Sequence, residues 1–105
     1  MLRATNAGIL KTASVGSGLE RVESLNGTAI ATESGDIVFT ETVSRVRIIA
    51  NTYDMLFRSS RDGINFEDQI HIKHDVEQSF DITCASFKVQ RYDVNDTDYE
   101  VEGYR

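Results

Sequence analysis

The chain has 105 residues, of which 40% are hydrophobic and 27% charged, and these values are typical of one globular domain rather than a disordered segment. The formal net charge of −6, with no run of Lys or Arg, predicts that the protein does not bind nucleic acid. One cysteine, Cys84, excludes an internal disulfide and a cysteine-based zinc cluster. Because no apolar run is long enough for a signal peptide or a membrane span, we expect a soluble product of a reducing cytoplasm, without a membrane partner.

Residues 1–18 consist mainly of small and polar side chains, with Ile9, Leu10 and Val15 as their main apolar residues. This is too little apolar surface to fold alone. Two interpretations stay open: a frayed terminus, or an extended arm that becomes ordered by lying on a neighbouring subunit. In the second case Gly16-Ser17-Gly18 would be its flexible joint.

The next segment, from Leu19 to Leu25, has an apolar side chain at every third residue, a spacing that predicts one or two helical turns. The Asn26-Gly27 pair then predicts a turn. Residues 28–32 have the pattern of a short strand, and residues 36–40 that of a second one after another turn. We therefore expect these two strands to form a hairpin.

Residues 42–51 have the clearest strand pattern in the chain. Every second residue from Val46 to Ala50 is apolar, and Arg45 and Arg47 occupy the alternate positions. The β-branched residues in this window disfavour a helix. We expect the apolar side chains to face the core and the two arginines to be exposed.

The segment from Tyr53 to Cys84 has the features of a sheet's hub, because short alternating runs are separated by acidic or glycine-bearing turns. Its Asp62-Gly63 pair predicts a hairpin between residues 55–57 and residues 64–66, since glycine takes positive φ without steric cost. The alternation that follows places Cys84 in the core.

The remaining residues predict further short strands and an acidic loop over residues 92–98. Seven or so strands, with no helical segment long enough for a parallel crossover, indicate an all-β fold. We predict a small antiparallel β-sandwich or barrel, jelly-roll-like, over residues 19–105, with an extended N-terminal arm over residues 1–18.

No pattern of residues predicts catalysis, a metal or another cofactor. His71 and His74 are three apart in a strand-like segment, where such positions point to opposite faces, so we expect no shared metal and assign them no role. The loop from Asp93 to Asp98 has calcium-type oxygen ligands but lacks the central glycine, and we interpret it as a solvated turn. The serines lack a Gly-x-Ser-x-Gly context, and Cys84 is expected in the core. We expect a protein that is not an enzyme.

Four stretches carry a resemblance to a known type of protein: Ser59–Phe66 (SSRDGINF), Ile70–Ile72 (IHI), Gln78–Ile82 (QSFDI) and Phe87–Gln90 (FKVQ). Their order resembles that of small β-sandwich virion structural proteins of tailed bacteriophages. The resemblance extends over residues 43–105 and consists of turns and hydrophobic alternation.

The resemblance implies a capsid decoration or cement protein, which is made in the host cytoplasm and located in the virion. Its partner would be the major capsid protein or another virion protein, with a homotrimer at a local threefold position as the preferred geometry. The alternatives are a neck, tail or baseplate component, or a carbohydrate- or receptor-binding module of a tail appendage. The residues expected to contact the partner are Ile9, Leu10 and Val15 in the arm, and Arg45 and Arg47 on the exposed strand face.

Overall fold

The structure is a computed structural model that describes residues 19–105. All regular elements in this range are β-strands. The strands are β1 (Arg21–Ala29), β2 (Ile37–Val43), β3 (Arg45–Ala50), β4 (Met55–Ser60), β5 (Ile70–Ile72), β6 (Gln78–Phe80), β7 (Cys84–Arg91) and β8 (Thr97–Tyr104).

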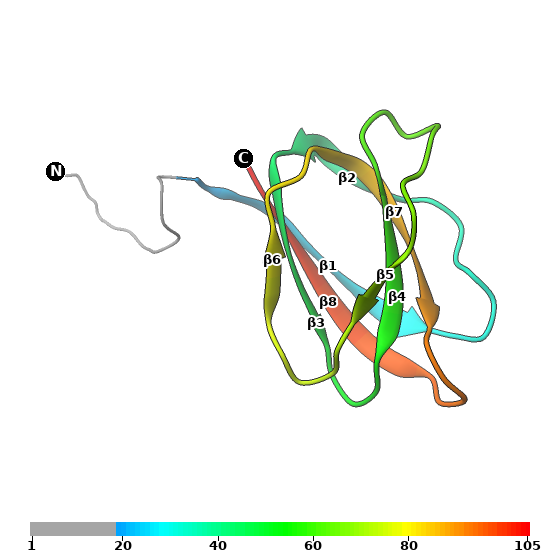
Figure 1. Ribbon diagram of the computed structural model, residues 1–105. Coiled ribbons are helices and arrows are strands. Elements are labelled where there is room, and N and C mark those ends of the chain that lie inside the picture. Colours follow the sequence, from blue (N-terminus) through cyan, green and yellow to red (C-terminus); the bar gives the residue numbers. More distant parts are fainter. Residues whose placement is uncertain (1–18) are drawn as a thin grey trace, which may run out of the picture.

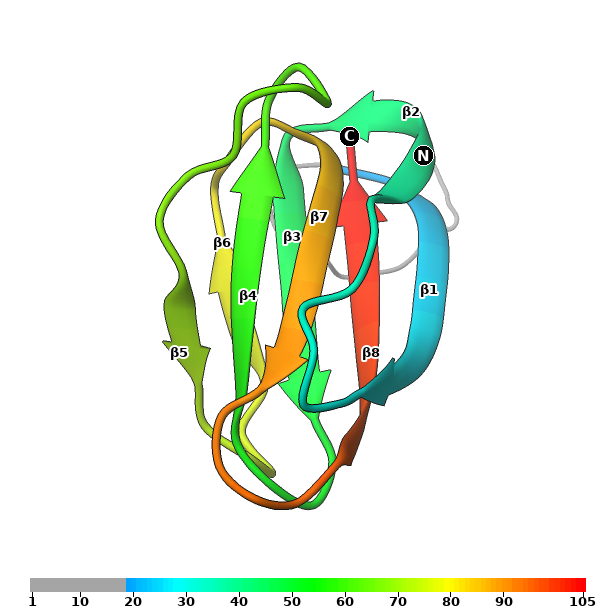
Figure 2. The same cartoon turned by 90° about the vertical axis from the view of Figure 1, so that its right-hand side faces the viewer.

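The strands form two antiparallel sheets of four strands each, which pack as a sandwich (Figure 1). Sheet I has the order β1-β8-β3-β6, and sheet II has the order β2-β7-β4-β5. Figure 2 shows β5, β4 and β7 of sheet II side by side. The chain crosses between the sheets after every strand except β4, an arrangement of eight strands in two sheets that corresponds to a jelly roll. The predicted all-β, antiparallel sandwich is therefore confirmed, while the predicted arm lies outside the described residues.

The core lies between the two sheets and is built from alternate residues of each strand. Val46, Ile48 and Ala50 of β3 are fully buried, which confirms the alternation expected for that strand. Phe87 of β7 lies at the centre, with ring centroids 5.5 Å from Phe39 and 5.3 Å from Phe57. Their close packing excludes water from the interior.

The helix expected from Leu19 to Leu25 and the turn expected at Asn26-Gly27 are both wrong, because all but the first two of these residues belong to β1. A register shift between Arg21 and Glu23 interrupts the pairing of β1 with β8. Such a bulge changes the side-chain alternation, so Val22 and Leu25, three apart, both pack against the core. An apolar spacing of three, which resembles a helical period, thus arises within a strand.

The hairpin expected between residues 28–32 and residues 36–40 is also wrong. β1 pairs with β8 in sheet I, whereas β2 pairs with β7 in sheet II. The connection itself runs along β7: the backbone N–H of Ser34 donates to the carbonyl of Val89 at 2.8 Å, and that of Arg91 donates to Ile30 at 2.9 Å. These contacts direct the chain into the other sheet.

The turn at Asp62-Gly63 is present. Gly63 has a positive φ, as the sequence predicted, with a value of 81°. The Asp62 carboxylate accepts the backbone N–H groups of Ile64 at 2.8 Å and Asn65 at 2.9 Å, which fixes the loop. The expected return strand is reduced to one bridge, between Ser60 and Phe66. The sheet partners of β4 are instead β5 and β7.

Candidate functional site

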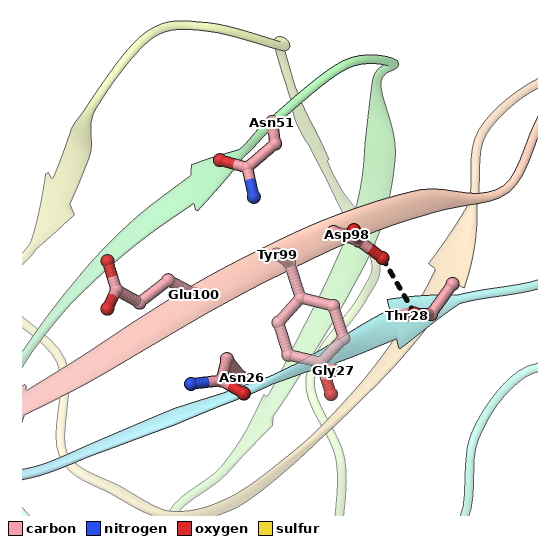
Figure 3. A pocket seen from close by; sticks show the side chains of 7 residues that line it. All are labelled: Asn26, Gly27, Thr28, Asn51, Asp98, Tyr99 and Glu100. Carbon is pink, nitrogen blue, oxygen red and sulfur yellow. Dashed lines mark hydrogen bonds between the residues drawn. The ribbon is translucent and has the colours of Figure 1, made fainter.

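An open polar groove lies on sheet I, where β1 and β8 lie side by side at the end of β3 (Figure 3). Its volume is about 470 Å³. Two cross-strand pairs, Asn26–Glu100 and Thr28–Asp98, form its sides, and Gly27 pairs with Tyr99 between them. Asn51, the residue after β3, completes the lining. We refer to these seven residues as the β1–β8 groove.

The two carboxylates of the β1–β8 groove are each held by one hydroxyl group. Thr28 Oγ1 donates to Asp98 Oδ1 at 2.7 Å, and Ser24 Oγ donates to Glu100 Oε2 at 3.2 Å. Within residues 19–105 neither carboxylate forms an ion pair. Each therefore keeps an oxygen available to a ligand.

The next carboxylate on the same face of β8, Glu102, is compensated by the protein itself. Arg21 Nη1 lies 3.2 Å from its Oε2, Arg47 Nη1 pairs with its Oε1, and the hydroxyl of Tyr104 donates to Oε1 at 2.8 Å. Burial raises the pKa of Glu102, but the Tyr104 hydrogen bond and the charges of Arg47 and Arg21 outweigh it, so the pKa lies below its ordinary value. Glu102 is a structural anchor within sheet I.

The two arginines predicted to contact a partner lie on the outer face of β3, as the alternation indicated, but they are half-buried rather than exposed. Arg47 pairs with Glu77 as well as with Glu102. Arg45 Nε lies 2.6 Å from Asp81 Oδ1. Both guanidinium groups thus join β3 to neighbouring parts of their own chain. The other predicted contact residues, Ile9, Leu10 and Val15, lie outside the described residues.

The expectation that His71 and His74 point to opposite faces is wrong, because both reach the carboxylate of Asp54. His71 Nε2 lies 2.6 Å from Asp54 Oδ2, and His74 Nδ1 lies 2.5 Å from Oδ1. β5 ends at Ile72, so the strand alternation no longer applies to His74, which instead bridges to Ala50 in parallel. The period of two holds within β5 but not at His74, which lies two residues beyond the end of that strand.

This histidine–aspartate cluster joins three loops at one end of the sandwich. Asp54 precedes β4, His74 lies between β5 and β6, and Tyr92, which follows β7, stacks on the His71 ring with centroids 4.0 Å apart. The pKa of Asp54 lies well below its usual range, because His74 donates a side-chain and a backbone N–H to it and His71 donates a third hydrogen bond. No set of three His, Cys, Asp or Glu side chains among residues 19–105 has a geometry that would hold a metal ion.

Replacing Asp54 with asparagine should lower the free energy of unfolding at neutral pH by about 1 kcal/mol, because charge-assisted hydrogen bonds to two imidazoles are weakened. The folded pKa lies below the unfolded value of about 3.9. The carboxylate therefore stabilises the fold above that value, and this contribution is lost as the pH falls through the folded pKa. Urea unfolding at a series of pH values should show a shallower loss of stability in acid for the variant.

The matched control for this prediction is Asp68→Asn, since Asp68 is an exposed carboxylate for which the structure shows no hydrogen bond within residues 19–105. This variant should keep the acid dependence of the parent protein. Equal acid profiles for Asp54→Asn and the parent would contradict a role of Asp54 in joining the loops.

The candidate nucleophiles of the sequence occupy structural positions. Cys84 is fully buried, and burial raises the pKa of its thiol to about 11, which leaves little reactive thiolate at neutral pH. Ser60 Oγ donates to the carbonyl of Asn65 at 2.7 Å and accepts the backbone N–H of Gly63 at 2.8 Å, so it holds the loop. In the acidic loop, Asp96 pairs with Arg91 at 2.8 Å.

No protein-family model, curated protein sequence or solved structure matches this chain. Within residues 19–105 there is also no helix with the length and apolar character that a membrane span requires.

Proposed function

We propose that the protein is a noncatalytic structural protein of a tailed-bacteriophage virion, which binds the assembled capsid shell and stabilises it. The resemblance of residues 43–105 to small virion β-sandwich proteins supports this proposal. So does the jelly-roll arrangement, which is common in viral capsid domains, although a fold alone does not determine a function.

The observation that carries the proposal is the edge of sheet I. β1 has nine residues, lies at the end of the strand order and pairs only with β8 among the described strands. An edge strand of this length presents backbone N–H and C=O groups that another chain can pair with. Residues 1–18 precede this edge directly, and if extended the first 15 of them could reach across roughly 50 Å. Edge pairing together with an arm would hold neighbouring shell subunits to one another.

Deleting residues 1–15 should leave the sandwich folded while weakening its attachment to the shell. Burial of Ile9, Leu10 and Val15 on a neighbour would contribute up to roughly 1.5–3 kcal/mol each, so we expect an affinity at least about tenfold lower. The measurement is add-back of purified protein to stripped capsids, read out as occupancy by electron microscopy and as the melting temperature of the capsid.

A full-length variant with Ile9, Leu10 and Val15 changed to serine is the control, because it keeps the length of the arm. It should bind as weakly as the deletion if apolar burial holds the arm in place. Full occupancy of the shell by both variants would contradict the proposal that the arm contributes to attachment. Binding of the parent protein to isolated tails or necks rather than to capsids would contradict its proposed location on the capsid.

The preferred assembly is a homotrimer at a local threefold position, since closed symmetry allows one small domain to contact several shell subunits. Light scattering coupled to size exclusion measures whether the trimer exists before attachment or forms only on the shell. Electron microscopy of the decorated particle then gives the position of the copies.

A further inference from the structure

We propose that the β1–β8 groove is a binding site for a saccharide, recognised through its vicinal hydroxyl groups. This site lies on a face of sheet I beside the free edge of β1, and it would add a ligand to a protein whose proposed role is structural.

The first support is the unused hydrogen-bonding capacity of the groove. The side-chain amides of Asn26 and Asn51 form no hydrogen bond within the described part of the chain, and Figure 3 shows them on opposite sides of β8 in the lining of the groove. An amide provides donors and an acceptor, and a carboxylate provides acceptors only. Asn26, Asn51, Asp98 and Glu100 together can therefore satisfy hydroxyl groups that act as donor and acceptor at once.

The second support is that all but one of the seven groove residues belong to two paired strands, with Asn51 directly after β3 as the exception. Asn26, Thr28, Asp98 and Glu100 are fixed in two adjacent pairs by the register of β1 and β8. The hydroxyl groups of Thr28 and Ser24 orient the two carboxylates. Polar groups that are already held in place lose little conformational freedom when a ligand binds.

The composition of the groove also distinguishes between classes of ligand. An apolar ligand finds no suitable surface, because the one aromatic residue in the lining, Tyr99, is only 6% exposed and belongs to the core. Within residues 19–105, the two groove carboxylates have no third carboxylate, imidazole or thiolate close enough to complete a metal site with them. A small polyol can bridge amides and carboxylates at both sides of the groove, since each hydroxyl can donate to a carboxylate oxygen and accept from an amide N–H.

Titration of the full-length, isotope-labelled protein tests the proposal by nuclear magnetic resonance. The probes are the methyl glycosides of glucose, galactose and mannose, together with N-acetylglucosamine. We expect at least one of them to cause saturable shifts of backbone amides in β1, in β8 and at Asn51. In the double variant Asn26→Ala/Asn51→Ala the affinity should fall about tenfold or more, because at least one hydrogen bond to the ligand is lost.

Asn95→Ala is the matched control, since Asn95 is exposed and lies outside the groove. It should bind the same sugar with the affinity of the parent protein. The proposal is overturned if no probe gives saturable shifts, if the shifts fall elsewhere, or if the double variant binds unchanged. It is also overturned if only calcium chloride or N-acetylarginine amide perturbs the groove, because the site would then select cations.

Discussion

Replacing Phe87 with alanine should lower the free energy of unfolding by about 3–5 kcal/mol, the largest effect we expect from a single truncation. Phe87 is fully buried, and its ring packs against Phe39 at 5.5 Å and against Phe57 at 5.3 Å between centroids. Its removal leaves a cavity that rigid strands on both sides cannot close. Single domains of this size have a free energy of unfolding of only about 5–15 kcal/mol, so the substitution removes a large part of the stability of the fold.

Urea unfolding followed by circular dichroism measures this loss, and Phe66→Ala is its control. Phe66 is partly exposed, with its ring 4.5 Å from the Lys88 ammonium, and it lies outside the core cluster that residues 19–105 form. We expect its truncation to cost about 1 kcal/mol or less. If Phe87→Ala were no more destabilising than Phe66→Ala, that result would contradict the packing of the two sheets around Phe87.

The fold class could be predicted from the sequence because local alternation determines it. The period of two from Val46 to Ala50 correctly indicated which face of β3 is buried. The spacing of Val22 and Leu25 predicted a helix wrongly, since a bulge imitates a helical period over so short a window. Alternation gives the burial of a residue reliably only where a strand is regular.

The pairing of strands could not be predicted, because it depends on contacts between residues far apart in the chain. Turn signals between β1 and β2 suggested a hairpin, yet the two strands belong to different sheets. The β1–β8 groove has the same origin, since Asn26 and Glu100 meet only through the register of β1 with β8. No spacing along the sequence indicates such a site.

The cluster at Asp54 shows a second reason for failure. Asp54 lies 17 residues before His71 and 20 before His74, too far along the chain for the periodicity of one helix or strand to relate them. The two imidazoles converge because the chain leaves β5 and turns at Asp75, which has a φ of 59°. The mostly polar residues 74–78 indicate a link between strands, but not that Asp75 takes a positive φ, which is uncommon for a non-glycine residue.

Replacing Gly103 with alanine should destabilise the fold by about 1–3 kcal/mol, although alanine ordinarily suits a strand better than glycine. A Cβ atom at Gly103 would lie 2.7 Å from Val43 Cγ1 and 2.8 Å from Phe39 Cε1, closer than unbonded carbon atoms approach. Gly103 belongs to the central strand β8 and pairs with Val46 of β3, so its backbone cannot move without disturbing sheet I.

Gly35→Ala is the matched control, because a Cβ atom there would meet nothing within 4 Å. It should be neutral or slightly stabilising, since it only restricts the unfolded chain. The double variant Val43→Ala/Gly103→Ala separates crowding from a general intolerance of side chains. If the Cβ atom is crowded by Val43, the two changes should be less destabilising together than the sum of each alone, with a coupling of about 0.5–3 kcal/mol in thermal or urea unfolding. Strict additivity would assign the crowding to Phe39 or to the backbone of β8 rather than to Val43, and an unaffected Gly103→Ala would contradict the close approach of β2 to β8.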